Sequence, residues 1–183
     1  PLPIACVAHL GLARLCYEWN DLEAAEEHGL RSLQLARQIE NNDRFAACEL
    51  FLVRLKLAQA DTAGAATLLA QADKSIHQHH FVALLQELTA VHILILLHQG
   101  DVSAAAQLAQ THDLPGSQAR VHLAQGNPSA ALAVLEPWQQ QMKTKGWADG
   151  QLRVMVLQAV AYAELGEMET AVFHLTNALT LAE

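Results

Sequence analysis

Three arginines lie at the same distance before a turn in three segments of the chain, where they could bind an anion. Arg14, Arg54 and Arg120 each lie six residues before a turn, on a segment predicted to be helical. A guanidinium group binds carboxylate or phosphate through paired hydrogen bonds, so a line of arginines would suit an anionic ligand or an acidic partner segment. The alternative is that each arginine forms an ion pair with an acidic residue of a neighbouring helix and only solvates the surface.

Four further residues are expected on the same helical face, about one turn away from these arginines. They are Tyr17, Leu57, Glu87 and Arg153. Together the two groups form the predicted ligand-binding set on the inner face of the fold, which comprises Arg14, Tyr17, Arg54, Leu57, Glu87, Arg120 and Arg153.

A dense histidine tract, His77-Gln78-His79-His80, comes nearest to a metal site. His77 and His80 would share a helix face at i and i+3, a spacing that metal sites can use. Apart from Asp73, no acidic or cysteine ligand accompanies them closely. The favoured interpretation is therefore a polar turn between repeats, and we predict no metal site.

The cysteines and tryptophans offer little chemistry. Cys6, Cys16 and Cys48 are widely spaced, which is typical of reduced thiols in a cytoplasmic protein. Cys16 is a candidate redox sensor, but a small core residue is the favoured interpretation. The three tryptophans lie near predicted helix ends, where packing is favoured over the stacking of a ligand.

No catalytic constellation is found in the 183 residues. The sequence has no nucleophile elbow, no metal-binding helix motif and no phosphate-binding glycine loop. Many acidic residues instead mark the starts of predicted helices, where they favour the helix dipole. We therefore predict that the chain is not an enzyme and holds no cofactor.

Composition limits the fold and the partners. Hydrophobic residues make up 52% of the chain but aromatic residues only 5%, so alanine and leucine, both strong helix formers, dominate. A net charge of -8 argues against contact with nucleic acid. No signal peptide or membrane-spanning stretch is visible, so we expect a cytoplasmic location without membrane contact. The chain begins at Pro1 rather than Met, and we expect a fragment of a longer protein.

A turn followed by alanine recurs along the chain. The alanines are Ala25, Ala65, Ala105, Ala131 and Ala171, at intervals of 40, 40, 26 and 40 residues. In each unit a glycine, an asparagine or another small residue ends one helix, and an acidic residue or asparagine begins the next. One helical hairpin cannot bury its apolar stripe alone, so the hairpins must stack. The sequence predicts an all-α, right-handed superhelical solenoid of about five hairpins.

The repeat also places the helices. First helices are expected near residues 4–19, 44–59, 81–99, 116–125 and 150–165. Second helices are expected near residues 22–39, 62–77, 102–111, 128–145 and 167–182. Pro137 lies inside one of these segments and is expected to kink it.

The hairpins resemble tetratricopeptide (TPR) repeats, in which an aromatic residue follows a small residue of the first helix and alanine follows the turn. The fifth repeat fits best, through Ala159, Tyr162, Gly166, Ala171 and Ala178. At the aromatic position the other four repeats carry Cys16, Lys56, Leu96 and His122. The 40-residue interval also exceeds the usual period of about 34 residues.

Three segments carry a narrower resemblance through their order and spacing. They contain YEWNDLEAAE at residues 17–26, RVHLAQGNP at 120–128 and AYAELGE at 161–167. These segments resemble the helical sensor domain of MalT-like, LuxR-family ATP-dependent (STAND-type) bacterial transcription regulators. The resemblance implies one TPR-like helical repeat domain over residues 1–183, taken from a larger regulator.

The resemblance also implies a function. Such a domain binds a small-molecule inducer or a regulatory protein in its superhelical groove and controls self-association of the full-length regulator. Nucleotide and DNA would be bound by other modules, since this sequence has neither a phosphate-binding loop nor a basic recognition helix. The alternative is a generic TPR-type scaffold for protein–protein interaction, unrelated to transcription.

Overall fold

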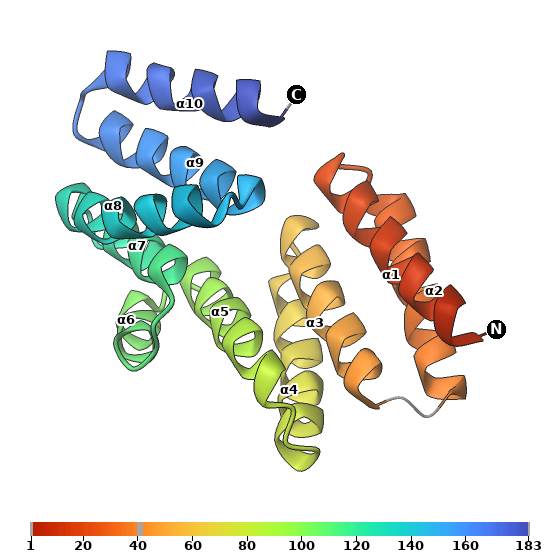
Figure 1. Ribbon diagram of the computed structural model, residues 1–183. Helices are drawn as coiled ribbons and strands as arrows, with labels where there is room; N and C mark the ends of the chain where they lie inside the picture. The colour runs from red at the N-terminus through yellow and green to blue at the C-terminus, as the bar shows by residue number, and fades with distance from the viewer. Residues whose placement is uncertain (1, 40–41, 183) are drawn as a thin grey trace. The chain divides into compact units, whose positions relative to one another are not determined.

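The computed structural model describes residues 2–39 and 42–182, and these residues form ten α-helices and no strand (Figure 1). The helices are α1 (Leu2–Glu18), α2 (Leu22–Gln38), α3 (Asn42–Ala58), α4 (Thr62–Gln78), α5 (Val82–His98), α6 (Val102–Gln110), α7 (Pro115–Ala124), α8 (Pro128–Lys145), α9 (Ala148–Glu164) and α10 (Met168–Ala182). The predicted all-α fold is confirmed. No helix in the described part of the chain is long and apolar enough to cross a membrane.

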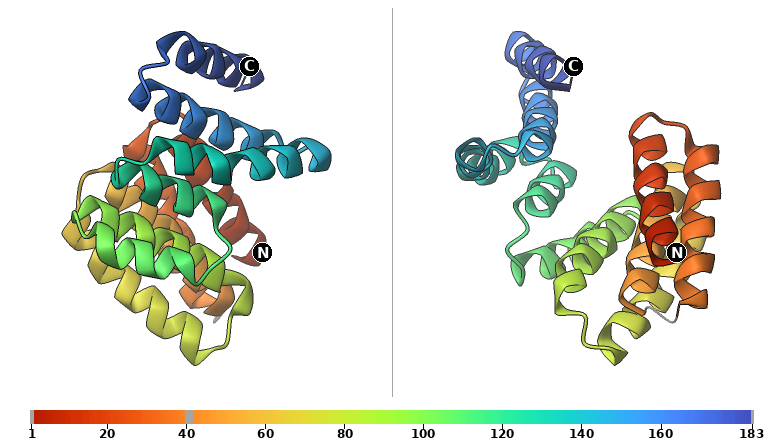
Figure 2. Two further views of the ribbon diagram at one scale, coloured as in Figure 1. Left: turned by 90° about the vertical axis from the view of Figure 1, so that its left-hand side faces the viewer. Right: turned by 45° about the vertical axis from the view of Figure 1, so that its right-hand side comes forward.

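The chain divides into two compact units, Pro1–Gln99 and Gly100–Glu183. The first unit holds α1 to α5 and the second holds α6 to α10. Within each unit every helix packs against the next one along the chain, as the views of Figure 2 also show. Each unit is therefore a stack of helices in chain order, which is the arrangement of a helical solenoid. The single domain expected over residues 1–183 stays a prediction.

The helix boundaries agree with the predicted ones to within two residues at every end. The agreement extends to the two short helices, α6 with 9 residues and α7 with 10, that the 26-residue interval requires. Pro137 lies inside α8, which the structure assigns as one helix from Pro128 to Lys145.

Four second helices begin with the same cap. A side-chain oxygen of Asp21, Asp61, Asp101 or Asn127 accepts a hydrogen bond from the backbone N–H three residues later, at 2.8 to 3.2 Å. Each cap satisfies a backbone donor that the first helical turn leaves unpaired, which is worth about 1 kcal/mol. The predicted starts of these helices therefore have a local cause.

The alanine after each turn is a packing residue. Ala25, Ala65, Ala105 and Ala131 are fully buried, and Ala171 is 5% exposed. A larger side chain would separate the two helices of the hairpin, since protein interiors are packed without spare volume. The abundance of alanine in the composition follows from this repeated close approach.

The turns themselves require a left-handed backbone. Asn20, Ala60, Gly100, Gly126 and Gly166 have φ angles between 59° and 80°. Glycine adopts this conformation without strain and asparagine tolerates it, whereas the Cβ of an alanine meets the following carbonyl oxygen. Ala60 is therefore the strained member of the series.

Ala60→Gly is expected to stabilise the protein by roughly 0.5 to 1 kcal/mol, because the relief of left-handed strain exceeds the entropy that glycine adds to the unfolded chain. Urea unfolding would measure the change. The matched control is Gly100→Ala, where an added Cβ meets nothing within 4 Å and only backbone strain acts, so a loss of similar size is expected. A decrease in stability for Ala60→Gly would contradict the argument.

Candidate functional site

The structure brings two members of the predicted ligand-binding set together. A terminal nitrogen of Arg54 on α3 lies 3.5 Å from Oε1 of Glu87 on α5, and both side chains are about a third exposed. This contact is the ion pair between helices that was the alternative to anion binding. Arg153 likewise pairs with Asp149 of its own helix α9, at 3.2 Å.

The other members of the set lie in different surroundings. Tyr17 is half-buried, with its ring edge-on to Phe51 at a centroid distance of 6.1 Å. Leu57 is buried in the core cluster of α3, α4 and α5. Arg14 is exposed, and Arg120 is half-buried and donates to the carbonyl of Gly116 at 3.1 Å. That the seven residues bind a ligand stays a prediction.

The second half of the histidine tract, His79 and His80, lies in the connection between α4 and α5 as predicted, whereas His77 and Gln78 still belong to α4. His77 lies in the last turn of α4, with Nδ1 3.2 Å from a carboxylate oxygen of Asp73. His80 has a φ of 55° and is the left-handed residue of this turn. In the described ranges no group of three or more histidine, cysteine or acidic residues is placed to hold a metal ion.

A buried polar cluster joins α1, α2 and α3, and sequence reasoning did not find it. The Ser32 hydroxyl donates to the carbonyl oxygen of Cys6 at 2.8 Å and lies 3.2 Å from the sulfur of Cys48. Burial raises the pKa of the Cys48 thiol to about 11, so the reactive thiolate is scarce at neutral pH. The cluster is a packing feature.

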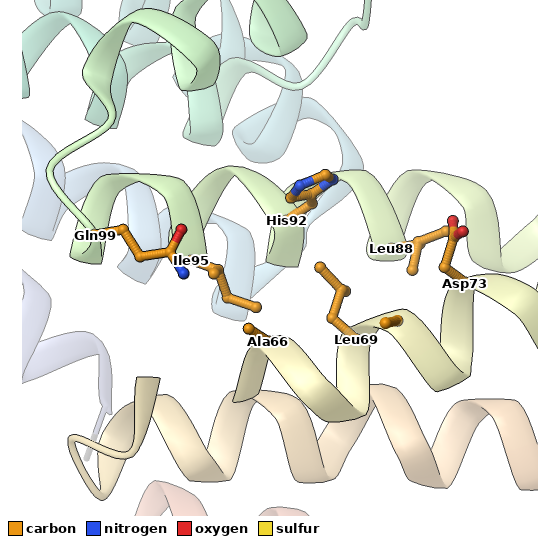
Figure 3. A pocket seen from close by; sticks show the side chains of 8 residues that line it. Ala66, Leu69, Asp73, Leu88, His92, Ile95 and Gln99 are labelled. Atoms are coloured by element: carbon orange, nitrogen blue, oxygen red, sulfur yellow. The ribbon is translucent and has the colours of Figure 1, made fainter. Parts of the chain in front are cut away.

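Two open grooves lie between consecutive repeats, one in each unit, and each encloses about 330 Å³. In the α4–α5 groove, Leu69 and Ile95 face each other near the centre, with Asp73 and Leu88 toward one end and Gln99 toward the other (Figure 3). The remaining lining residues there are Ala66, Ala70 and His92. The α6–α7 groove is lined by Ala106, Ala109 and Gln110 of α6, by Gln118, Val121 and His122 of α7, and by Gln125, which follows α7.

The two grooves occupy the same place in the repeat. Equivalent residues lie at the same distance after the alanine that follows each turn, or at the same distance before the turn glycines Gly100 and Gly126. The equivalent pairs are Ala66 and Ala106, Leu69 and Ala109, Ala70 and Gln110, His92 and Gln118, Ile95 and Val121, and Gln99 and Gln125. A recurring position in the repeat therefore forms both grooves.

A charged side chain takes this place between α2 and α3. Glu26 is the equivalent of Ala66 and Ala106. Its carboxylate accepts hydrogen bonds from Nζ of Lys56 at 2.9 Å and from the side-chain amide of Gln59 at 2.7 Å. These two hydrogen bonds, that of Lys56 first, lower the pKa of Glu26. Alanine at the equivalent positions removes both the bulk and the charge.

The junction of α8 and α9 carries different side chains at these positions. Leu132 stands where the grooves have Ala66 and Ala106. The side-chain N–H of Gln139 donates a hydrogen bond to the side-chain oxygen of Gln158 at 3.1 Å. Gln139 is the equivalent of Asp73 in the α4–α5 groove, and Gln158 is the equivalent of His92. Both grooves therefore lie where this repeat position carries alanine.

Sequence reasoning missed the groove residues. The repeat register does show that the position varies among glutamate, alanine, leucine and valine, and this signal was available. The sequence does not show which side chains face this position, because those side chains belong to the first helix of the next repeat.

The helices and their stacking in chain order define a helical repeat domain. The family model of the MalT-like TPR region matches residues 1–183, the whole chain. The chain therefore belongs to the family of MalT-like TPR regions. No match to an individual curated protein was found.

Proposed function

We propose that the chain is the effector-sensing domain of a MalT-like, LuxR-family transcription regulator. It binds a small-molecule inducer in a groove between repeats and so controls self-association of the full-length protein. The observation that carries the proposal is the pair of open grooves at equivalent positions, in a chain of the MalT-like family. Their volume of about 330 Å³ lies within the range of small-molecule sites, about 300 to 1,000 Å³.

The mechanism follows from the position of the grooves between repeats. A ligand in the α4–α5 groove touches two helices that belong to different hairpins, so its affinity depends on how these hairpins are arranged. Binding then shifts the equilibrium between resting and associating forms by the difference in affinity for the two. In this proposal the domain works in the cytoplasm, needs no catalysis or cofactor, and touches neither nucleic acid nor membrane.

A protein-interaction scaffold is the second candidate. Its support is the exposed apolar side of α10, where Val172, Phe173 and Leu179 are 55%, 62% and 62% exposed. Apolar side chains exposed together are typical of a surface that binds another protein. Such a scaffold would bind a peptide or protein on this surface and would have no role in transcription.

A groove-filled variant tests the proposed function. Ala66→Leu combined with Ala106→Leu copies the leucine that the chain itself carries at position 132. In a thermal-shift screen of sugars, amino acids, nucleotides and organic acids, at least one compound should raise the melting temperature of the native chain. A ligand at about 100 times its Kd adds about 2.7 kcal/mol of stability, which is several degrees. The filled variant should show no shift with that compound.

The matched control is Ala63→Leu, an exposed position of α4 outside the groove, which should keep the response. Sedimentation velocity with and without the active compound then measures self-association of the chain. A panel without a stabilising compound, or one whose active compounds stabilise the filled variant equally, would refute binding in the grooves.

A further inference from the structure

We propose that the α6–α7 groove binds a small organic carboxylate, whose anionic group takes the place that the Glu26 carboxylate has between α2 and α3. This inference rests on the proposed function and deepens it, because it names the chemical class of ligand for one of the two grooves.

The chain supplies its own precedent for such a site. Between α2 and α3 the carboxylate of Glu26 is held by a cationic side chain, Lys56, and by an amide one turn later, Gln59, at 2.9 and 2.7 Å. Charge-assisted hydrogen bonds of this kind are stronger than those between neutral groups. The first helix of this repeat therefore presents a pair of donors to the preceding second helix.

The α6–α7 groove keeps a donor pair and lacks the carboxylate. His122 and Gln125 stand where α3 carries Lys56 and Gln59, and both line the groove. Ala106 stands where α2 carries Glu26. A histidine ring donates through N–H and carries positive charge when protonated, so it can replace lysine opposite an anion.

A second observation points to a ligand at this place. The buried Nδ1 of His122 has no hydrogen-bond partner within the described part of the chain. A buried polar atom without a partner costs free energy and is rare in proteins, so a turn of the ring toward the groove that His122 lines would be favoured by a ligand that bonds this nitrogen.

The lining sets the rest of the ligand's chemistry. None of the residues that line the α6–α7 groove is acidic, so none of them opposes an anion. Ala106, Ala109 and Val121 supply apolar walls, which suit a short aliphatic or aromatic body. The α4–α5 groove differs, because Leu96 takes the place of His122 and Asp73 lies in the lining.

Matched acids and amides test the inference. Acetate, butyrate and benzoate would be titrated into the 183-residue chain by calorimetry, each beside its neutral amide. At least one acid should bind about tenfold more tightly than its amide, the difference expected for hydrogen bonds to a charged group. No binding by any acid, or equal binding by each acid and its amide, would overturn the proposal.

Two variants locate the site. Ala106→Glu supplies the carboxylate from α6 and should abolish acid binding, whereas Ala66→Glu in the α4–α5 groove should leave it unchanged. His122→Leu copies Leu96 of the other groove and should weaken acid binding about tenfold. Undiminished acid binding by Ala106→Glu would overturn the proposal. If the acids fail while another compound stabilises the native chain and not the groove-filled variant, the carboxylate inference is wrong and the proposed function stands.

Discussion

Glu49→Gln should abolish a loss of stability that the native protein shows as the pH rises from about 5 to about 7. Glu49 lies on α3 and is 4% exposed, and its Oε2 has no hydrogen-bond partner in the described ranges. Burial raises the pKa of its carboxyl group to about 7, against the opposing attraction of Arg37. The group therefore remains protonated in the folded protein at a pH where the unfolded chain has ionised it.

The direction of the pH effect follows from proton linkage. Between the unfolded pKa of 4.5 and the folded pKa of about 7, the folded state binds more protons than the unfolded state. Stability then falls as the pH rises through this range, by up to about 3 kcal/mol from this group. Below pH 4.5 both states hold the proton and the contribution is constant.

Urea unfolding at pH 5 and pH 8 measures the effect. Native protein and Glu49→Gln should differ by less than about 1 kcal/mol at pH 5, and the variant should be the more stable by about 2 to 3 kcal/mol at pH 8. Glu27→Gln removes the same charge from an exposed position of α2, and its free energy of unfolding should match that of the native protein at both pH values. A pH dependence in Glu49→Gln equal to that of the native protein would contradict the argument.

The helices could be predicted from the sequence because their signals are local. Asp61 caps α4 through a backbone N–H three residues away, and Gly100 adopts the left-handed turn by itself. The repeat then extended these signals to weaker sites such as Ala60, whose residue type alone does not indicate a left-handed turn. Composition and register were therefore sufficient for the fold.

The site could be predicted only in part because its contacts join residues of different repeats. The register placed Arg54 at a recurring position, but its pairing with Glu87 depends on how α5 crosses α3. Leu57 was expected on the inner face, yet α3 packs against four other helices of its unit and buries this side chain. Neither the partner of an arginine nor the burial of a leucine follows from spacing within one helix.

Leu55→Ala is expected to lower the free energy of unfolding by about 3 kcal/mol, within the usual range of about 2 to 5 for a buried leucine. Leu55 lies on α3 and has no exposed surface. It packs in one cluster with Ala13 of α1 and Ala25 of α2, whose short side chains are held by their own helices and cannot move into the space. A cavity should therefore remain. Its free-energy cost adds to the transfer free energy that is lost with the removed side-chain atoms.

Urea unfolding measures the loss, and hydrogen exchange shows where it acts. The stability of a repeat array is carried by contacts between neighbouring elements. Leu55→Ala should therefore increase the amide exchange rates of α1, α2 and α3 more than those of α8, α9 and α10. Leu30→Ala removes the same atoms from a side chain that is 50% exposed on α2, and it should cost less than about 1 kcal/mol. Equal losses for the two variants would show that α1, α2 and α3 close around the missing side chain, contrary to the rigid packing inferred from Ala13 and Ala25.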